Sequence, residues 1–237
     1  MNSEPFSRQW IKEMTQRWSD SIDEDIYRMM TTTAITIDTT YGDISQAQAI
    51  RMARSVLEPG LRQDVRFDYP GGATEIWVSN IVVALLKATG IGVALETGAF
   101  RGHTTTLLAQ ALRDMGGGTL YVAEMDTERA MMVALGVQNL YLPNVEALVS
   151  AREALAVIHD LPDQSVGLAF LDDDHTKDHV AKEIEAVWPK MASGGIVCFH
   201  DVFGVCDLQS VVKHYGGYSL DFPRCGPAGG LGILQVR

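Results

Sequence analysis

The feature that most constrains the fold is a regular alternation of short apolar runs and helical patterns after Gly72. Strand-like runs are expected at 92–96, 120–123, 145–149, 167–171 and 196–199. Helical patterns lie before and between these runs, at 73–88, 104–113, 128–135, 153–159 and 179–191. Short apolar strands joined through helices are typical of βαβ units, whose parallel sheet is buried on both faces. The sequence therefore predicts an α/β fold with a doubly wound, mostly parallel sheet.

The end of the chain has a different pattern. Residues 218–222 and 231–236 are strand-like, and a segment rich in turn-forming residues joins them. Two strands joined in this way predict a closing antiparallel hairpin. With the runs before it, the hairpin brings the expected sheet to seven strands.

The start of the chain is polar and helical rather than alternating. Trp10, Met14 and Trp18 recur at four-residue spacing, as expected of an amphipathic helix that buries one face. We therefore expect two units: an N-terminal helical cap or lid over residues 1–72, and a ligand-binding domain over residues 73–237.

Composition excludes several partners. The 237 residues include 19 Lys+Arg and 30 Asp+Glu, so the formal net charge is −11. Nucleic acids and anionic membranes are bound through clustered Lys and Arg, which are scattered singly here, so neither is an expected partner.

The longest apolar run, 81–86, is too short to span a bilayer. Cys198, Cys206 and Cys225 have no Cys-x-x-Cys spacing, and without an export signal we expect reduced thiols and a cytoplasmic protein.

A glycine loop follows the first expected strand, where Gly98 and Gly102 stand in G-x-x-x-G spacing. Such glycines let the backbone turn tightly against a ligand, and the following helix offers free N–H groups. The spacing fits neither the dinucleotide fingerprint G-x-G-x-x-G nor a P-loop. Glu96 ends the first strand, and Glu124 ends the second, where an acid binds ribose hydroxyls in such sheets. These acids would repel a pyrophosphate but suit a positively charged nucleoside such as S-adenosylmethionine (SAM).

The segments 95–104 (LETGAFRGHT) and 123–126 (AEMD) resemble the first two motifs of class I SAM-dependent methyltransferases, which have a Rossmann-like fold. The resemblance is to catechol O-methyltransferase-like enzymes and related small-molecule and sugar O-methyltransferases, and it covers residues 73–237. It implies that the loop glycines and Glu96 hold the methionine portion, that Glu124 binds the ribose and that 149–153 meet the adenine. The implied cofactor-binding residues are Glu96, Thr97, Gly98, Phe100, Gly102, His103, Thr104, Glu124, Met125, Ala151, Arg152 and Asp172.

Acidic and histidine side chains also follow the fourth and fifth expected strands. The run 172–175 (DDDH) comes after the fourth strand, and His200 and Asp201 end the fifth. Both positions lie at the same edge of a parallel sheet. Carboxylates there suit Mg²⁺, and a histidine ligand widens the choice to Mn²⁺, Fe²⁺ or Zn²⁺. Metal-dependent members of the family carry one Asp and then an acidic pair at these positions, which implies a metal site at Asp172, His200 and Asp201, with Mg²⁺ as the expected ion.

His175 lies three residues after Asp172, where the catechol enzymes carry a basic residue that removes the hydroxyl proton. Because histidine titrates near neutrality, it suits this task. The resemblance thus implies in-line methyl transfer from SAM to a small-molecule hydroxyl, with His175 and Asp172 as catalytic residues and the metal on the acceptor oxygen. We expect His159, His179 and His214 at the surface of their helices.

Other interpretations stay open from the sequence. One is a metal-independent transfer to an oxygen or nitrogen acceptor, with His175 acting alone, and another is a non-catalytic nucleoside-binding protein of the same fold. An NAD oxidoreductase is disfavoured by the missing middle glycine. A catechol, a sugar hydroxyl and a natural-product phenol all fit as acceptors. The N-terminal helices either close over the acceptor or form the contact of a homodimer.

Overall fold

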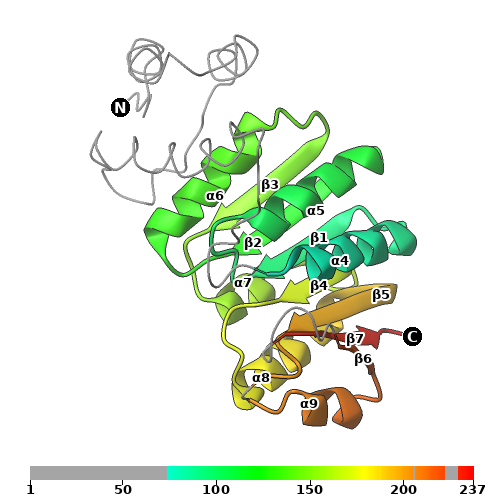
Figure 1. Ribbon diagram of the computed structural model, residues 1–237. Helices are drawn as coiled ribbons and strands as arrows, with labels where there is room; N and C mark the ends of the chain where they lie inside the picture. The colour runs from blue at the N-terminus through cyan, green and yellow to red at the C-terminus, as the bar shows by residue number, and fades with distance from the viewer. Residues whose placement is uncertain (1–73, 205, 222–228) are drawn as a thin grey trace, which may run out of the picture.

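The computed structural model describes residues 74–204, 206–221 and 229–237. These residues form a seven-stranded sheet in the order β3-β2-β1-β4-β5-β7-β6 (Figure 1). The strands are β1 (Val93–Thr97), β2 (Gly118–Ala123), β3 (Val145–Ser150), β4 (Val166–Leu171), β5 (Met191–His200), β6 (Tyr218–Leu220) and β7 (Leu231–Gln235). The helices are α4 (Ile76–Thr89), α5 (His103–Asp114), α6 (Thr127–Asn139), α7 (Ala154–Asp160), α8 (Lys177–Val187) and α9 (Gln209–His214), with a 3-10 turn η2 (Trp188–Lys190). The predicted doubly wound sheet is confirmed, whereas the expected helical cap over 1–72 lies outside the described residues.

The pairing of the strands follows the expected pattern. The five strands β1 to β5 pair in parallel, and β7 pairs antiparallel with both β5 and β6. The closing hairpin is therefore present, with its first strand ending at Leu220. His214 was expected on a helix, but the range of helix α9 was not predicted, because six residues are too few to show a helical period.

The region around Pro189 differs from the sequence-based expectation. Helix α8 ends at Val187, four residues before the expected end at 191, and the turn η2 follows. Proline favours the first turn of a helix and interrupts a longer one, which accounts for the break. Strand β5 then begins at Met191, five residues before the expected start at 196.

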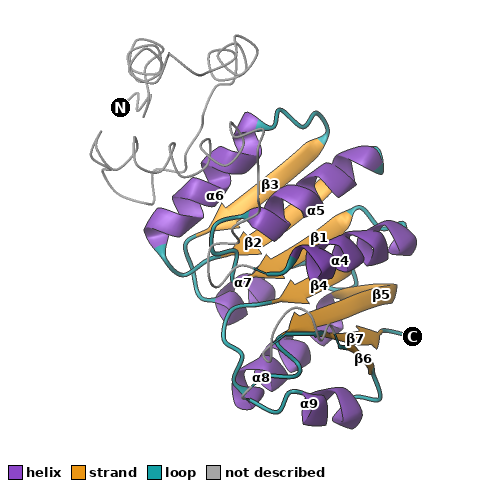
Figure 2. Cartoon of the chain, in the orientation of Figure 1, coloured by secondary structure: helices purple, strands orange, loops and turns teal. Residues whose placement is uncertain are grey.

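Two helical layers enclose the sheet (Figure 2). Side chains of α4, α5 and α6 pack in one apolar cluster, and those of α7, α8 and α9 pack in another. Successive strand residues alternate between these clusters, so Ala94 belongs to the first and Leu95 to the second. The same alternation places Glu96 on the face of α5 and Thr97 on the face of α8.

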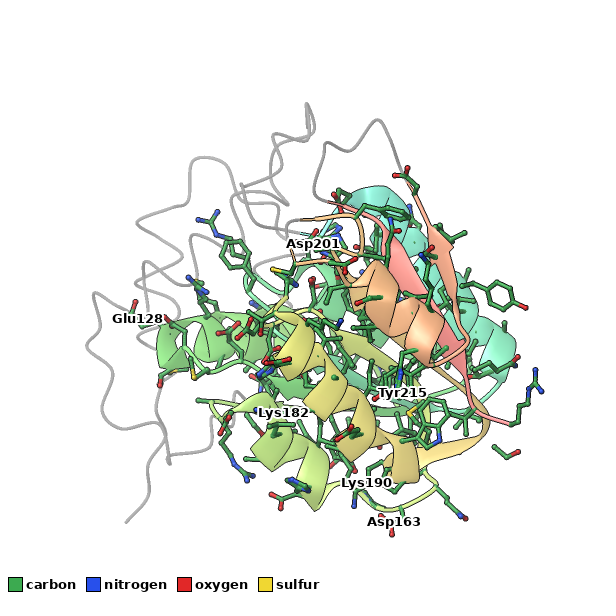
Figure 3. All side chains as sticks on the ribbon, turned by 90° about the horizontal axis from the view of Figure 1, so that it is seen from below. Glu128, Asp163, Lys182, Lys190, Asp201 and Tyr215 are labelled. Carbon is green, nitrogen blue, oxygen red and sulfur yellow. The ribbon has the colours of Figure 1, made fainter. Side chains whose placement is uncertain are left out.

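The neighbouring strands β1 and β4 mark the point where the strand order reverses, so the loops at their carboxyl ends diverge and leave room for a ligand. Figure 3 shows Asp201 at this carboxyl edge, and Lys190 and Asp163, an ion pair of 2.7 Å, at the opposite edge. None of the helices in the described ranges is long and apolar enough to cross a membrane.

Candidate functional site

The glycine loop after β1 lies directly against the loop after β4. Gly98 has φ +73°, and a Cβ atom at this position would overlap the backbone carbonyl of Asp172. The amide of Gly98 donates to the carbonyl of Ala123 at the end of β2 (2.9 Å), and the amide of Asp172 donates to the carbonyl of Thr97 (3.1 Å). Glycine at 98 is therefore required both by its left-handed backbone and by the close approach of the next loop.

Glu124 joins the glycine loop to the loop after β2. Its carboxylate is buried and accepts the amide of Phe100 at Oε2 (2.8 Å) and the amide of Asp126 at Oε1 (2.9 Å). The Phe100 ring in turn lies 4.8 Å from the guanidinium of Arg129 on α6. Each carboxylate oxygen has two lone pairs, so Glu124 keeps acceptor capacity for a ligand hydroxyl.

Glu96 is a buried acid beside this loop. Its side chain is 1% exposed, and its Oε2 atom has no hydrogen-bond partner. Burial, together with the nearby charges of Asp172 and Glu124, raises the pKa of Glu96 to about 8. A cationic ligand bound beside Glu96 would therefore stabilise the ionised form of this carboxyl group.

The remaining residues expected to bind the cofactor take different positions. Met125 is strongly exposed beside Glu124, and Ala151 directly follows β3 at the same edge. The guanidinium of Arg152 pairs with Asp160 (2.7 Å) on α7, so it is directed along that helix. His103 begins α5, whereas the buried hydroxyl of Thr104 lies 3.0 Å from that of Ser79 on α4. The loop glycines, Phe100 and the two acids are thus brought together, while Arg152 and Thr104 are engaged elsewhere.

A charged cluster occupies the carboxyl ends of β4 and β5. The Nδ1 atom of His200 lies 3.0 Å from Oδ1 of Asp172 and 3.4 Å from Oδ1 of Asp201. Its Nε2 atom lies 2.6 Å from Oε2 of Glu75, which precedes α4, and Thr74 donates to Asp172 from the same segment. Burial alone would lower the pKa of His200, but the hydrogen bonds to Asp172 and Glu75 and the charge of Asp201 raise it to about 10. His200 is therefore a protonated imidazolium between carboxylates.

His175 lies at the rim of this cluster. Its Nε2 atom is 3.6 Å from Oδ2 of Asp201 and 4.0 Å from Oδ1 of Asp172, and its side chain is 36% exposed. The ring meets that of His200 edge-on, with centroids 6.1 Å apart. Burial raises the pKa of Asp201, against the opposing charges of His200 and His175. His175 is thus the histidine of the cluster that combines solvent access with two carboxylate neighbours.

The residues expected to bind a metal do not present a free set of ligands. Both ring nitrogens of His200 are engaged with carboxylates, and a protonated ring nitrogen cannot bind an ion. Within the described residues, another possible set of metal ligands consists of Asp173, His179 and Glu183. Their ligand atoms all lie within 4.8 Å of one another. His179 was expected at the surface of its helix, but it is half-buried against these two acids.

Sequence reasoning missed three of these side chains. Glu75 carries no signal, because it precedes a helix and meets His200 only in the folded chain. His179 and Glu183 do carry one, since their i,i+4 spacing places both on the same face of a helix. Glu183 is fully buried, and burial together with the charge of Asp173 raises its pKa to about 9.

Comparisons with known proteins find a methyltransferase-domain match and similar folds. Residues 95–202 match the family described as a methyltransferase domain. The fold is similar to that of an O-methyltransferase from Bacillus cereus solved with S-adenosylhomocysteine (SAH), with TM-score 0.58, 15% identity, and coverage of 84% of this chain and 94% of that chain. It is also similar to the O-methyltransferase TomG from Streptomyces achromogenes solved with SAM, with TM-score 0.58, 17% identity, and coverage of 94% and 99%. A search of curated proteins gave no match. The predicted resemblance to class I SAM-dependent methyltransferases is confirmed.

Proposed function

We propose that this chain, whose residues 95–202 match a methyltransferase-domain family, transfers the methyl group of SAM to a hydroxyl oxygen of a small molecule. The observation that carries this proposal is the position of His175. It is a partly exposed imidazole beside two carboxylates, at the same sheet edge as the glycine loop. A donor site and a proton acceptor are the two elements that such a transfer requires.

The donor site is formed by the loops after β1 and β2. Gly98 lets the backbone of the loop turn in the left-handed region, and Glu124 holds the amide of Phe100. Glu96 lies buried beneath the loop, where the positive charge of SAM would compensate its carboxylate. The two similar O-methyltransferases that were solved with SAH and SAM support the choice of this ligand.

The acceptor side is formed by the loops after β4 and β5. His175 accepts the proton of the acceptor hydroxyl as the oxygen attacks the methyl carbon and the bond from that carbon to sulfur breaks. The resulting imidazolium is stabilised by Asp201 and Asp172, which lie 3.6 and 4.0 Å away. The products are a methyl ether and SAH, and the proton then leaves the partly exposed ring to solvent.

Asp172, His200 and Asp201 do not fit the divalent ion that the resemblance implies. Neither ring nitrogen of His200 has a lone pair to offer, because Glu75 and Asp172 accept hydrogen bonds from both. The imidazolium itself supplies a positive charge beside Asp172 and Asp201. The proposed reaction therefore takes the metal-independent form, and His200 acts as a positioning residue for the two carboxylates.

The experiment that tests this function has two stages. Calorimetry with SAM and with SAH comes first, and we expect both to bind. Release of SAH is then measured with a panel of catechols, phenols and sugars, for the wild type and for His175→Gln. Turnover of a hydroxyl acceptor that depends on His175 supports the proposal. Binding of SAH without turnover of any acceptor would instead favour a non-catalytic nucleoside-binding protein, and absence of binding would overturn both.

A further inference from the structure

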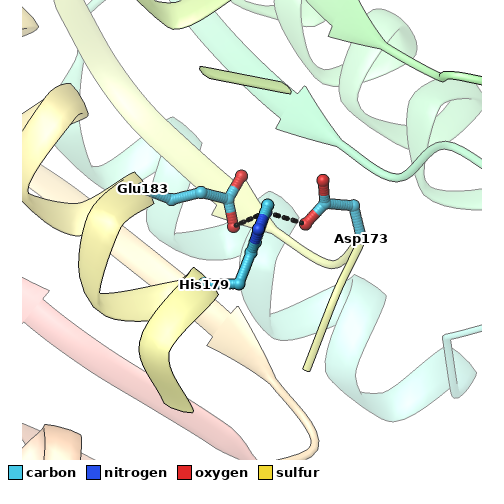
Figure 4. Close-up of side chains that lie close together, drawn as sticks. All are labelled: Asp173, His179 and Glu183. Carbon is cyan, nitrogen blue, oxygen red and sulfur yellow. Dashed lines mark ion pairs between the residues drawn. The ribbon is translucent and has the colours of Figure 1, made fainter. Parts of the chain in front are cut away.

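A second cluster of ligating side chains lies between the loop after β4 and α8. The Nε2 atom of His179 is 3.1 Å from Oδ1 of Asp173 and 3.7 Å from Oε2 of Glu183. In Figure 4 the imidazole lies between the two carboxylates, with His179 and Glu183 projecting from α8 and Asp173 from the loop. None of the three belongs to the methyl-transfer site described above.

The polar atoms of this cluster lack partners of their own. Glu183 is 0% exposed, and neither of its carboxylate oxygens has a hydrogen-bond partner. The Nε2 atom of His179 is likewise buried without one, in spite of the two oxygens close to it. Burial disfavours the ionised form of Glu183, and a cation bound at this place would stabilise its carboxylate in place of a proton. The unpaired atoms of His179 and Glu183 lie together, which points to one shared cation.

We propose that Asp173, His179 and Glu183 bind a divalent transition-metal ion such as Zn²⁺. An ion with bonds of about 2.1 Å separates its ligand atoms by about 3.0 Å in octahedral and about 3.4 Å in tetrahedral geometry. The observed separations of 3.1 and 3.7 Å are close to these values. One imidazole and two carboxylates are ligands for Zn²⁺, Mn²⁺ or Fe²⁺ rather than for Mg²⁺ or Ca²⁺. Asp173 is solvent-accessible and gives the ion a path into the site.

The ion would connect the loop after β4 to α8. This loop carries His175, which stands between Asp173 and His179 in the sequence. Within the loop, Asp173 accepts the amide of Asp174, and Asp174 accepts the amide of Thr176 (2.9 Å). An ion held by Asp173 and by two side chains of α8 therefore restrains both ends of the segment that positions His175. In this position the ion is structural and takes no part in methyl transfer.

The test is a measurement of metal binding that needs no activity assay. The full chain is stripped with a chelator and titrated with Zn²⁺ against a chromophoric competitor, and Co²⁺ is then used to record the visible spectrum of the bound ion. We expect one ion per chain, with affinity at least about tenfold lower in His179→Gln and in Asp173→Asn. The matched controls are His159→Gln, an exposed histidine of α7, and Asp201→Asn, at the other cluster. Both controls should keep the affinity of the wild type.

Hydrogen exchange supplies a second readout. We expect exchange of residues 172–179 to slow when Zn²⁺ is added to the wild type and to remain unchanged in Asp173→Asn. Asp173 lies in an exposed loop, so this variant keeps the test valid even if the His179 variant does not fold. Absence of Zn²⁺ binding by the wild type would overturn the proposal, because Glu183 would then be compensated by a proton. Binding that is lost in Asp201→Asn but kept in His179→Gln and Asp173→Asn would also overturn it.

Discussion

The Nε2 atom of His200, at the carboxyl end of β5, lies 2.6 Å from Oε2 of Glu75, the residue that precedes α4. This contact brings a segment from outside the methyltransferase match, which begins at residue 95, onto the edge of the sheet. It also engages the second ring nitrogen of His200, whose other nitrogen contacts Asp172. Both ring nitrogens of His200 are therefore engaged with carboxylates.

Replacement of Glu75 by Gln should lower both the pKa of His200 and the stability of the domain. The pKa of His200 is raised to about 10, so its contribution to stability is fully present below about pH 6.5 and is lost as pH rises toward 10. We expect Glu75→Gln to reduce the free energy of unfolding at neutral pH by about 1.5–3 kcal/mol, the typical contribution of a hydrogen bond to a charged group. Chemical denaturation from pH 6 to 10 measures this effect, and NMR of the imidazole protons measures the pKa.

The matched control for Glu75 is Glu146→Gln on β3, where the side chain is exposed. This change should leave the free energy of unfolding within about 0.5 kcal/mol of the wild type. If Glu75→Gln behaves like the control at pH 7, the contact between Glu75 and His200 does not stabilise the fold.

Replacement of Gly98 by Ala should damage the donor site. The new Cβ would overlap the carbonyl of Asp172, and the backbone would hold a left-handed conformation that alanine disfavours. Gly90→Ala at the end of α4 is the control, because it has a similar φ of +68° but nothing within 4 Å of the added atom. We expect the free energy of unfolding to fall by about 1–2 kcal/mol in Gly90→Ala and by more in Gly98→Ala. Gly98→Ala should also bind SAM more weakly. Equal losses in the two variants would show that the approach of Asp172 is not tight.

Binding of SAM should become tighter as pH rises toward 8. Burial raises the pKa of Glu96 to about 8, so the free protein carries a proton there at neutral pH, and a cationic ligand favours its release. Release of one proton increases the affinity by up to about tenfold per pH unit below that pKa. Calorimetry in buffers of different ionisation enthalpy measures the proton directly. Adenosine lacks the cationic portion and should show no such dependence, and Glu96→Gln should remove it for SAM.

Replacement of His175 by Gln should reduce turnover without affecting the binding of SAM. Loss of a general base typically lowers the rate about 10²–10⁴-fold. SAM binding should stay the same, because the loops of the donor site follow β1 and β2 rather than β4. His159→Gln on α7 is the control, because its side chain is exposed and should leave both quantities unchanged. Steady-state kinetics with the acceptor found in the panel, together with calorimetry for SAM, separates the two effects. Full turnover in His175→Gln would exclude this residue as the base.

Local patterns in the sequence were sufficient to predict the architecture of the sheet. The apolar run 167–171 is buried along its whole length as β4, and β6 pairs antiparallel with β7 as expected. Such features follow from the period of hydrophobic residues, which needs no knowledge of distant contacts. The boundaries near Pro189 were less accurate, because a 3-10 turn has no apolar period of its own.

The sequence by itself determined the sheet, the glycine loop and the set of acids at the carboxyl edge, because strand ends in a parallel sheet lie together whatever the remaining side chains do. Only the tertiary structure decided which partners those acids take. The fold brings Glu75 into contact with His200, so that both nitrogens of this ring have carboxylate partners. It also buries Glu183 beside His179 without a hydrogen bond. Charge compensation depends on distances between residues far apart in the chain and on the exclusion of water, and neither quantity is encoded in a local pattern.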